Sequence, residues 1–191
     1  MPSKNKTTPI ESGKYYHIFN RGNNYENVFY LHDDYIYFLQ RYKYHLKLCS
    51  ETFAYALIPN HFHFLIRVNE NVAYNFISNQ MKLLMQEYTY RINNRLGRSG
   101  NLFLKPFRRL EITSDEYFKQ LVFYIHYNPL KHKISENFRE YSYSSYKAIL
   151  ASSPTYINRE EVLEWFKGKT EFVEFHNFLH NEKQLEKLIF E

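Results

Sequence analysis

Two histidines separated by one residue, His61 and His63, are the first candidates for chemistry in this sequence. They follow Pro59-Asn60 and lead into the apolar run Phe64-Leu65-Ile66, a pattern typical of a β-strand. Side chains alternate between the two faces of a strand, so both imidazoles share one face about 6–7 Å apart while Phe62 points to the core. Two imidazoles in this arrangement can hold one divalent cation. The alternative is that both histidines are core residues, because a His-x-His pair is common by chance.

A second group of polar residues lies in the stretch Phe123-Tyr124-Ile125-His126-Tyr127-Asn128-Pro129. If this stretch is helical, Tyr124 and Asn128 are i and i+4 and lie on one helix face about 6 Å apart. This spacing places an amide oxygen, a hard metal ligand, beside a phenol. The chain has 19 tyrosines, so the alternative is that Tyr124 simply packs in the core.

The elements that must position these residues follow from hydrophobic periodicity and turn signals. Strands are predicted at 14–20, 52–58, 63–68 and 102–112, the last bent by Pro106, and helices at 32–46, 72–96 and from 113 toward Pro129. The order β-α-β-β-α-β predicts an α+β fold with a ferredoxin-like antiparallel sheet. A helix carrying Tyr124 and a C-terminal helical extension follow this unit. Such a topology supports many functions, so the fold alone does not identify one.

The charge and length of the chain suggest a domain organisation. Residues 1–13 are polar and are expected to form a flexible arm, and residues 14–150 a single domain. Residues 151–191 hold five Lys/Arg and eight Asp/Glu, a net charge of −3, which leaves +8 on residues 1–150 of the total of +5. We therefore expect an acidic C-terminal extension with one or two helices within 156–190. A basic, aromatic-rich body suits nucleic acid, although an AT-rich genome would also favour this composition.

Several classes of protein are excluded by composition. The single Cys49 rules out an internal disulfide framework and a cysteine-based zinc site. No window approaches the apolar run of about 20 residues that a membrane span needs, and the first eight residues lack the apolar stretch of a secretory signal. We expect a cytoplasmic protein without a membrane partner.

Five stretches occur together, in order, across residues 14–150. They are Tyr16-His17-Ile18-Phe19-Asn20-Arg21-Gly22, Tyr55-Ala56-Leu57-Ile58-Pro59-Asn60-His61-Phe62-His63, Gly97-Arg98-Ser99-Gly100, Tyr124-Ile125-His126-Tyr127-Asn128-Pro129 and Tyr143-Ser144-Ser145-Tyr146. In this order and spacing the sequence resembles the HUH single-tyrosine transposases, and among them the REP-associated tyrosine transposases. The chain departs from the commonest pattern at Leu130-Lys131-His132-Lys133, where many members carry Val-Arg-Ala-Gly. We expect this difference to affect DNA contacts more than chemistry.

The resemblance implies a complete active site and a reaction. Tyr124 would be the nucleophile, His61 and His63 the paired metal ligands and Asn128 the third ligand, with Mg²⁺ or Mn²⁺ as the cation. The enzyme would nick and join single-stranded DNA beside a hairpin through a 5′-phosphotyrosine, the chemistry of DNA transposition and recombination. The covalent link conserves the bond energy, so no nucleotide cofactor is needed.

DNA contacts are predicted from a basic region and from the family motif. Residues 79–133 contain ten Lys/Arg against four Asp/Glu, a charge that can follow phosphates, although a solvated helix face is the usual fate of such charges. The predicted DNA-contacting residues are Arg21, Gly22, Arg91, Arg95, Arg98, Lys105, Arg108 and Arg109.

Three other interpretations are open at this point. The first is a non-catalytic protein of the same fold that binds hairpin DNA or RNA. The second is an unrelated metallohydrolase that uses water as its nucleophile, and the third is a structural role for the histidines. The resemblance favours a monomer, and a homodimer is the alternative.

Overall fold

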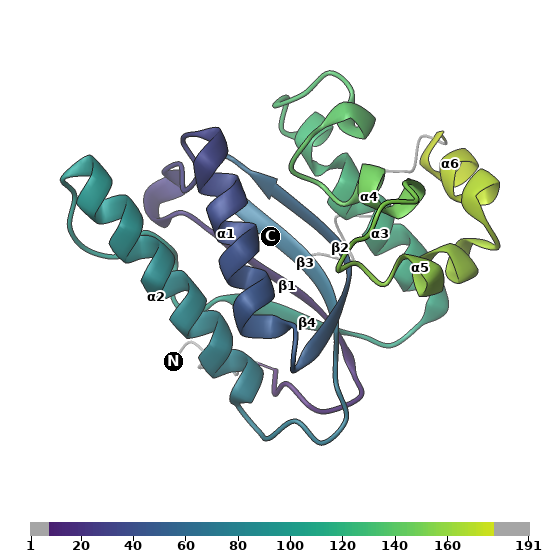
Figure 1. The fold of residues 1–191 in the computed structure, drawn as a ribbon, viewed down its shortest axis with the longest axis horizontal. Helices are drawn as coiled ribbons and strands as arrows, with labels where there is room; N and C mark the ends of the chain where they lie inside the picture. Colours follow the sequence, from purple (N-terminus) through teal and green to yellow (C-terminus); the bar gives the residue numbers. More distant parts are fainter. Residues whose placement is uncertain (1–7, 178–191) are drawn as a thin grey trace, which may run out of the picture.

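A four-stranded antiparallel sheet forms the centre of the protein in the computed structural model, which describes residues 8–177 (Figure 1). The strand order is β2-β3-β1-β4, with bounds Ser50–Ile58 for β2, His61–Val68 for β3, Tyr15–Arg21 for β1 and Arg108–Ile112 for β4. Together with the chain order β-α-β-β-α-β, this is the ferredoxin-like arrangement. The expected α+β fold class is confirmed.

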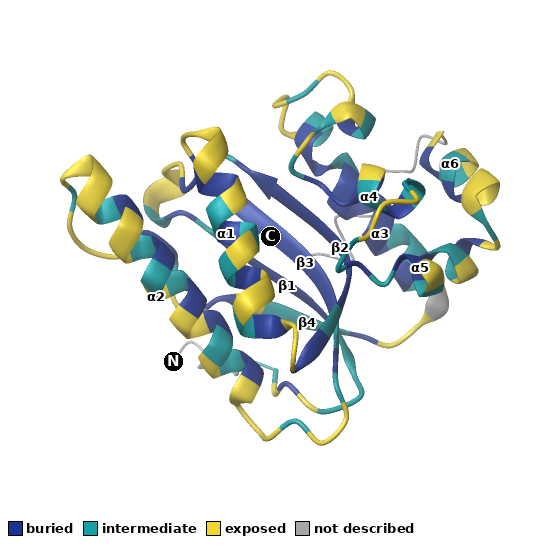
Figure 2. Cartoon of the chain, viewed as in Figure 1, coloured by how far each residue is buried: buried dark blue, intermediate teal, exposed yellow. Residues whose placement is uncertain are grey.

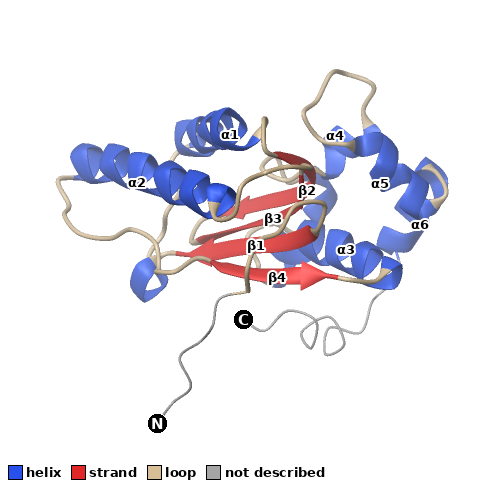
Figure 3. Cartoon of the chain, turned by 90° about the horizontal axis from the view of Figure 1, so that it is seen from below, coloured by secondary structure: helices blue, strands red, loops and turns tan. Residues whose placement is uncertain are grey.

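Helices lie on both faces of the sheet. The helices α1 (His32–Leu46) and α2 (Phe76–Leu96) lie together on one side, as Figure 3 shows. On the other face α3 (Asp115–Lys131) packs against β2 and β3. Around α3 are gathered α4 (Tyr146–Leu150), α5 (Arg159–Phe166) and α6 (Lys169–Asn177), and two short 3₁₀ turns span Asn23–Tyr25 and Phe138–Glu140.

The alternation along β3 decides which residues reach each face. Phe62 and Phe64 are fully buried toward α1, where the Phe38 ring lies 5.2 Å from Phe62 and the Tyr42 ring stacks 3.9 Å from Phe64. This packing is the hydrophobic core that the periodicity predicts, and Figure 2 shows the buried inner faces of both helices. The residues between these phenylalanines therefore point to the face occupied by α3.

Two elements are shorter than predicted. The helix expected from residue 72 begins at Phe76 because Asn71 and Asn75 have φ values of 61° and 64°, which a right-handed helix does not admit. The strand expected from residue 102 begins at Arg108. Before it, only an isolated bridge to Gly22 joins Phe103 to the sheet edge.

The start of α3 and the N-terminal arm also differ in detail from expectation. The helix is capped by Ser114, whose hydroxyl accepts a hydrogen bond from the Tyr117 N–H, one residue later than the predicted capping box. Residues 1–7 of the expected flexible arm lie outside the described residues. The part from 8 to 13 is packed on the body, since Ile10 is buried and the Gly13 N–H donates to the Val68 carbonyl at 2.9 Å.

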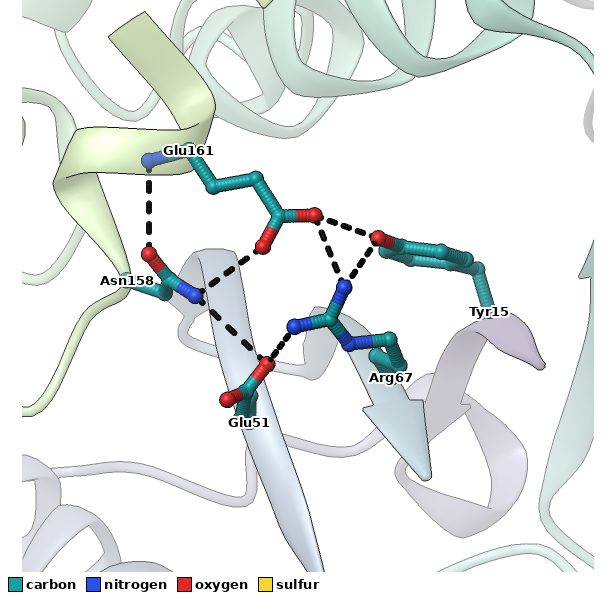
Figure 4. A network of polar contacts seen from close by, with 5 residues as sticks. All are labelled: Tyr15, Glu51, Arg67, Asn158 and Glu161. Carbon is teal, nitrogen blue, oxygen red and sulfur yellow. Dashed lines mark hydrogen bonds and ion pairs between the residues drawn. The ribbon is translucent and has the colours of Figure 1, made fainter. Parts of the chain in front are cut away.

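A polar network joins the C-terminal helices to the sheet (Figure 4). The Glu161 carboxylate on α5 accepts hydrogen bonds from the Tyr15 hydroxyl, from the Arg67 guanidinium at 3.0 Å and from the Asn158 amide at 3.1 Å. Arg67 also pairs with Glu51 on β2. Burial, followed by the bond to Glu161, raises the pKa of Tyr15 to about 12. One carboxylate on α5 thus contacts the side chains of two neighbouring strands.

An aromatic contact adds to this attachment. The Trp165 ring on α5 stacks 4.8 Å from Phe118 on α3 and lies 5.0 Å from Phe53 on β2. The expected helices within 156–190 are observed as α5 and α6, and residues 178–191 lie outside the described part of the chain. No helix between residues 8 and 177 combines the length and the apolar character required to cross a bilayer.

Candidate functional site

The two histidines of β3 lie at the start of the strand on the face that α3 covers. Their rings are 5.0 Å apart at 87°, and His61 and His63 are only 8% and 1% exposed. In the adjacent strand β1 their pairing partners are Arg21 and Phe19. The predicted shared face of the histidine pair is therefore confirmed.

The helix α3 brings the predicted tyrosine and asparagine to these histidines. The Asn128 Oδ1 atom lies 2.8 Å from Nε2 of His61. The Tyr124 ring lies edge-on to the His63 ring with 5.6 Å between centroids. Both α3 residues are buried, at 2% exposure for Tyr124 and 0% for Asn128. All four residues singled out by their spacing thus meet between one strand and one helix.

Neighbouring side chains hold each histidine ring in place. The Asn60 Oδ1 atom lies 2.8 Å from Nδ1 of His61, so His61 has an asparagine oxygen at each ring nitrogen. His63 is held by a third histidine, since Nε2 of His17 lies 2.9 Å from its Nδ1. Both rings of this pair are uncharged near neutral pH: burial lowers the pKa of His17 to about 3, and burial and then the neighbouring His61 lower that of His63 well below 6.5.

His17 is not among the residues that the sequence pattern singles out, although it lies in one of the five stretches. Strand alternation puts His17 on the same face as Phe19. Its proximity to His63 depends on the register, in which Phe19 is paired with His63 and His17 with Leu65. A prediction that β1 and β3 are adjacent, combined with this register, would have found the contact.

Two further residues enter the site from the end of α3. The Lys131 ammonium lies 5.0 Å from the centroid of the Tyr124 ring. The His132 ring contacts His61 at 4.7 Å and 71°. Both belong to the segment that departs from the commonest family pattern. The segment expected to affect mainly DNA contacts therefore touches the two central residues of the site.

The donors suit a divalent cation with a mixed nitrogen and oxygen shell. Neighbouring ligands of an octahedral ion with bonds of about 2.1 Å lie about 3 Å apart, close to the 2.8 Å between His61 Nε2 and Asn128 Oδ1. The Asn128 Nδ2 atom is buried without a hydrogen-bond partner among the described residues. A hydrogen bond from Nδ2 therefore cannot be the reason that this amide is buried. No group of three His, Cys, Asp or Glu side chains placed for a metal occurs within residues 8–177. A third ligand beside His61 and His63 would be the Asn128 amide oxygen.

A cleft of about 720 Å³ opens beside the two histidines. Its wall combines cations and aromatic rings, and the Arg21 guanidinium lies 3.7 Å above the Tyr25 ring. The lining residues include Phe19, Arg21, Tyr25, Asn60, His61, His63, Lys105, Pro106, Phe107, Arg108, Arg109 and His132. Four of the eight predicted DNA-contacting residues, namely Arg21, Lys105, Arg108 and Arg109, are brought to this cleft.

The three arginines of α2 and its C-terminal end are placed elsewhere. Arg95 forms an ion pair at 2.7 Å with the fully buried Asp34, and Arg98 pairs with Glu26 at 2.8 Å. The sequence alone groups these arginines with the cleft residues, because they lie near one another along the chain. The structure instead uses Arg95 and Arg98 to join α2 to the segments around α1.

Arg91 and Gly22 have structural explanations of their own. The Arg91 guanidinium lies 4.3 Å above the Tyr37 ring on α1. At Gly22 a Cβ atom would lie 2.0 Å from the carbonyl oxygen of Glu26. The chain's own turn therefore requires glycine here, and a close approach to DNA is not needed to explain it.

A buried histidine on another face of α3 attaches this helix to α6. His176 Nδ1–H donates to the Phe172 carbonyl at 2.7 Å, so its Nε2 accepts from Nδ1–H of His126 at 3.0 Å. The Nε2 atom of His126 then accepts from the Ser145 hydroxyl at 2.8 Å. These three bonds define one arrangement of protons with His126 uncharged.

We expect this network to make the protein acid-sensitive. Burial lowers the pKa of His126 well below 6.5, so the unfolded state takes up a proton that the folded state resists, and stability falls as the pH drops below about 6.5. Between pH 7 and 5 one such histidine contributes a loss of about 2 kcal/mol. In urea unfolding, the free energy of unfolding should fall between pH 7 and pH 5 by about 2 kcal/mol less in His126→Gln than in the unchanged protein. The control His32→Gln, at an exposed position, should lose as much free energy of unfolding as the unchanged protein. A loss of the same size in His126→Gln would contradict the prediction.

Comparison with known proteins gives a structural match without a sequence match. No family model matches the sequence, and no curated protein matches it. Among solved structures the chain is similar to a REP-associated tyrosine transposase bound to a REP hairpin. The TM-score is 0.65 at 18% sequence identity, and the match covers 80% of this chain and 88% of the other. At this identity the likeness shows a shared fold.

Proposed function

We propose that this protein is a metal-dependent tyrosine transposase of the REP-associated HUH type, which nicks and rejoins single-stranded DNA beside a hairpin. The observation that carries the proposal is the convergence of four residues from β3 and α3. Asn128 lies 2.8 Å from His61, and the Tyr124 ring contacts the His63 ring at 5.6 Å. The shared fold with a transposase bound to a REP hairpin supports the same function.

Tyr124 supplies the nucleophile of the proposed reaction. Its phenolic oxygen loses its proton to solvent and forms a bond to the phosphorus of a DNA phosphodiester, while the bond from phosphorus to the 3′ oxygen breaks and that oxygen takes up a proton from solvent. The protein is then linked to the 5′ phosphate, and attack by a 3′ hydroxyl reverses the step and joins two strands. The Lys131 ammonium, 5.0 Å from the Tyr124 ring, favours the negative charge that develops on the phenol and phosphate oxygens.

His61, His63 and Asn128 would hold the cation in this site. Two imidazoles and an amide oxygen form a ligand set compatible with Mg²⁺ or Mn²⁺. When bound, the ion supplies Lewis acidity to the scissile phosphate and fixes its orientation. The Asn60 Oδ1 atom, 2.8 Å from Nδ1 of His61, would accept the Nδ1 proton and so leave the lone pair of Nε2 to bind the cation beside Asn128.

The cleft beside the histidines suits an unpaired nucleotide. Phe19, Tyr25 and Phe107 offer rings for stacking and Arg21, Lys105 and Arg108 offer positive charge for phosphates. A stacked duplex cannot present a single base to such rings. The substrate we propose is therefore single-stranded DNA that enters the cleft beside its hairpin.

We expect Arg21→Ala to weaken single-strand binding and to reduce its salt dependence. Loss of one phosphate contact lowers the slope of log affinity against log salt by about 0.7 for a single strand. Fluorescence anisotropy between about 50 and 200 mM salt measures this slope. Arg91→Ala removes the same charge at Tyr37 and should leave the slope unchanged. Equal changes in both variants would argue against the cleft as the DNA path.

A nicking assay tests the function as a whole. The protein is incubated with Mn²⁺ and a hairpin-bearing single strand labelled at its 3′ end, and the products are separated on a denaturing gel. The proposal predicts a labelled band at the mass of protein plus the downstream fragment. Binding without cleavage would indicate a hairpin-binding protein, and cleavage without the adduct would indicate a hydrolase that uses water.

A further inference from the structure

The proposed site leaves a buried histidine on β1 without a role. His17 is fully buried, and its ring stacks on Phe19 at 4.6 Å and on His63 at 5.1 Å with an interplanar angle of 15°. Its Nε2 atom lies 2.9 Å from Nδ1 of His63. Its other ring nitrogen, Nδ1, has no hydrogen-bond partner among the residues described. Among the described residues, the side-chain hydrogen bond of His17 is therefore the one with His63.

The contact between these two rings constrains their protons. An uncharged imidazole carries one N–H and one lone pair, so a single proton lies between His17 Nε2 and His63 Nδ1. A histidine that binds a metal through Nε2 must carry its proton on Nδ1. His63 is then the donor and His17 the acceptor. In the opposite arrangement His63 carries its proton on Nε2 and cannot bind a cation there.

We propose that His17 is a positioning residue, whose Nε2 accepts the Nδ1 proton of His63 and so sets the orientation and tautomer in which His63 binds a divalent cation. This inference rests on the proposed function. Metal-binding histidines usually donate this proton to a carboxylate, a backbone carbonyl or water. An uncharged imidazole does the same task beside the Phe19 ring without burying a second charge. It also leaves the positive charge of the cation undiminished for a DNA phosphate.

Substitutions at His17 separate this role from packing. His17→Phe keeps an aromatic ring between Phe19 and His63 but removes the acceptor, and His17→Gln places an amide oxygen near the position of Nε2. Loss of such a partner weakens metal affinity by about 10–100-fold. We expect this loss in Mn²⁺ titrations of His17→Phe without DNA, and His17→Gln should restore most of the affinity. Melting temperatures in EDTA monitor packing separately.

Nitrogen-15 NMR on the unchanged protein gives a test that needs no substitution. With Mg²⁺ present, His63 should carry its proton on Nδ1, and this proton should exchange slowly because the pair is buried. A proton on Nε2 of His63 would overturn the inference, as would unchanged Mn²⁺ affinity in His17→Phe. Failure of the proposed function has a different signature: the unchanged protein would neither bind Mn²⁺ nor form the DNA adduct.

Discussion

Tyr124→Phe is expected to abolish the covalent protein-DNA adduct and to slow strand cleavage by at least about 1,000-fold, because it removes the only atom of the side chain that can attack phosphorus. The ring itself is retained, so its edge-on contact with His63 at 5.6 Å should persist. Binding of the hairpin substrate should remain close to that of the unchanged protein. The adduct is measured on a denaturing gel and the affinity by anisotropy.

A neighbouring tyrosine on the same helix provides the matched control. The Tyr127 ring stacks on Phe123 at 5.3 Å and lies edge-on to Phe138 at 5.9 Å. Tyr127→Phe also removes one hydroxyl from α3 and should form the adduct at the normal rate. If Tyr124→Phe still cleaved DNA, another group would have to be the nucleophile.

His61→Ala is expected to have the second largest effect. It removes one of the two imidazoles and leaves the buried Asn128 Oδ1 without the ring atom now 2.8 Å away. Adduct formation should fall by at least about 100-fold, because a first ligand contributes no less to metal binding than an outer-shell partner does. High Mn²⁺ should recover part of the lost activity, since two of the three proposed ligands remain. Titration of the cation in the nicking assay measures both effects.

A substitution of the exposed His32 is the control for His61→Ala, because it shows whether the loss of any histidine reduces adduct formation. The His32 ring lies on α1, 3.0 Å from the Tyr143 hydroxyl and away from the cleft. His32→Ala should therefore keep the normal dependence on Mn²⁺. Activity of the unchanged protein that persisted in EDTA, with no response to added cation, would contradict a metal role for His61.

Local periodicity predicts much of the fold and the core of the site. Alternation along β3 is sufficient to place Phe62 in the core and the two histidines on the opposite face. The i, i+4 spacing on α3 is sufficient to place Tyr124 beside Asn128. These relations hold within one strand or one helix, so they do not depend on how the elements pack. The metal-ligand role of Asn128 stays a prediction.

Relations between elements could not be predicted in the same way. Arg95 lies near Arg108 in the sequence, yet it pairs with Asp34 on α1, while Arg108 lines the cleft. A count of charges along the chain cannot distinguish Arg95 from Arg108, because residues of the basic stretch 79–133 reach both faces of the sheet. The contact of His17 with His63 was not predictable for the same reason, because it depends on the register between two strands.

The network in Figure 4 also affects the order in which the protein folds during its synthesis. The Tyr15 hydroxyl on β1 bonds to Glu161, which is 146 residues later in the chain. At about 5–20 residues per second, translation separates these two groups by roughly 7–30 seconds. Within that interval β1 lacks β4 until residues 108–112 have been made, and it lacks α5 until the end; α3 follows the last strand of the sheet. A nascent chain therefore has the two histidines well before it has Tyr124, and the proposed site can assemble only after α3 has been made.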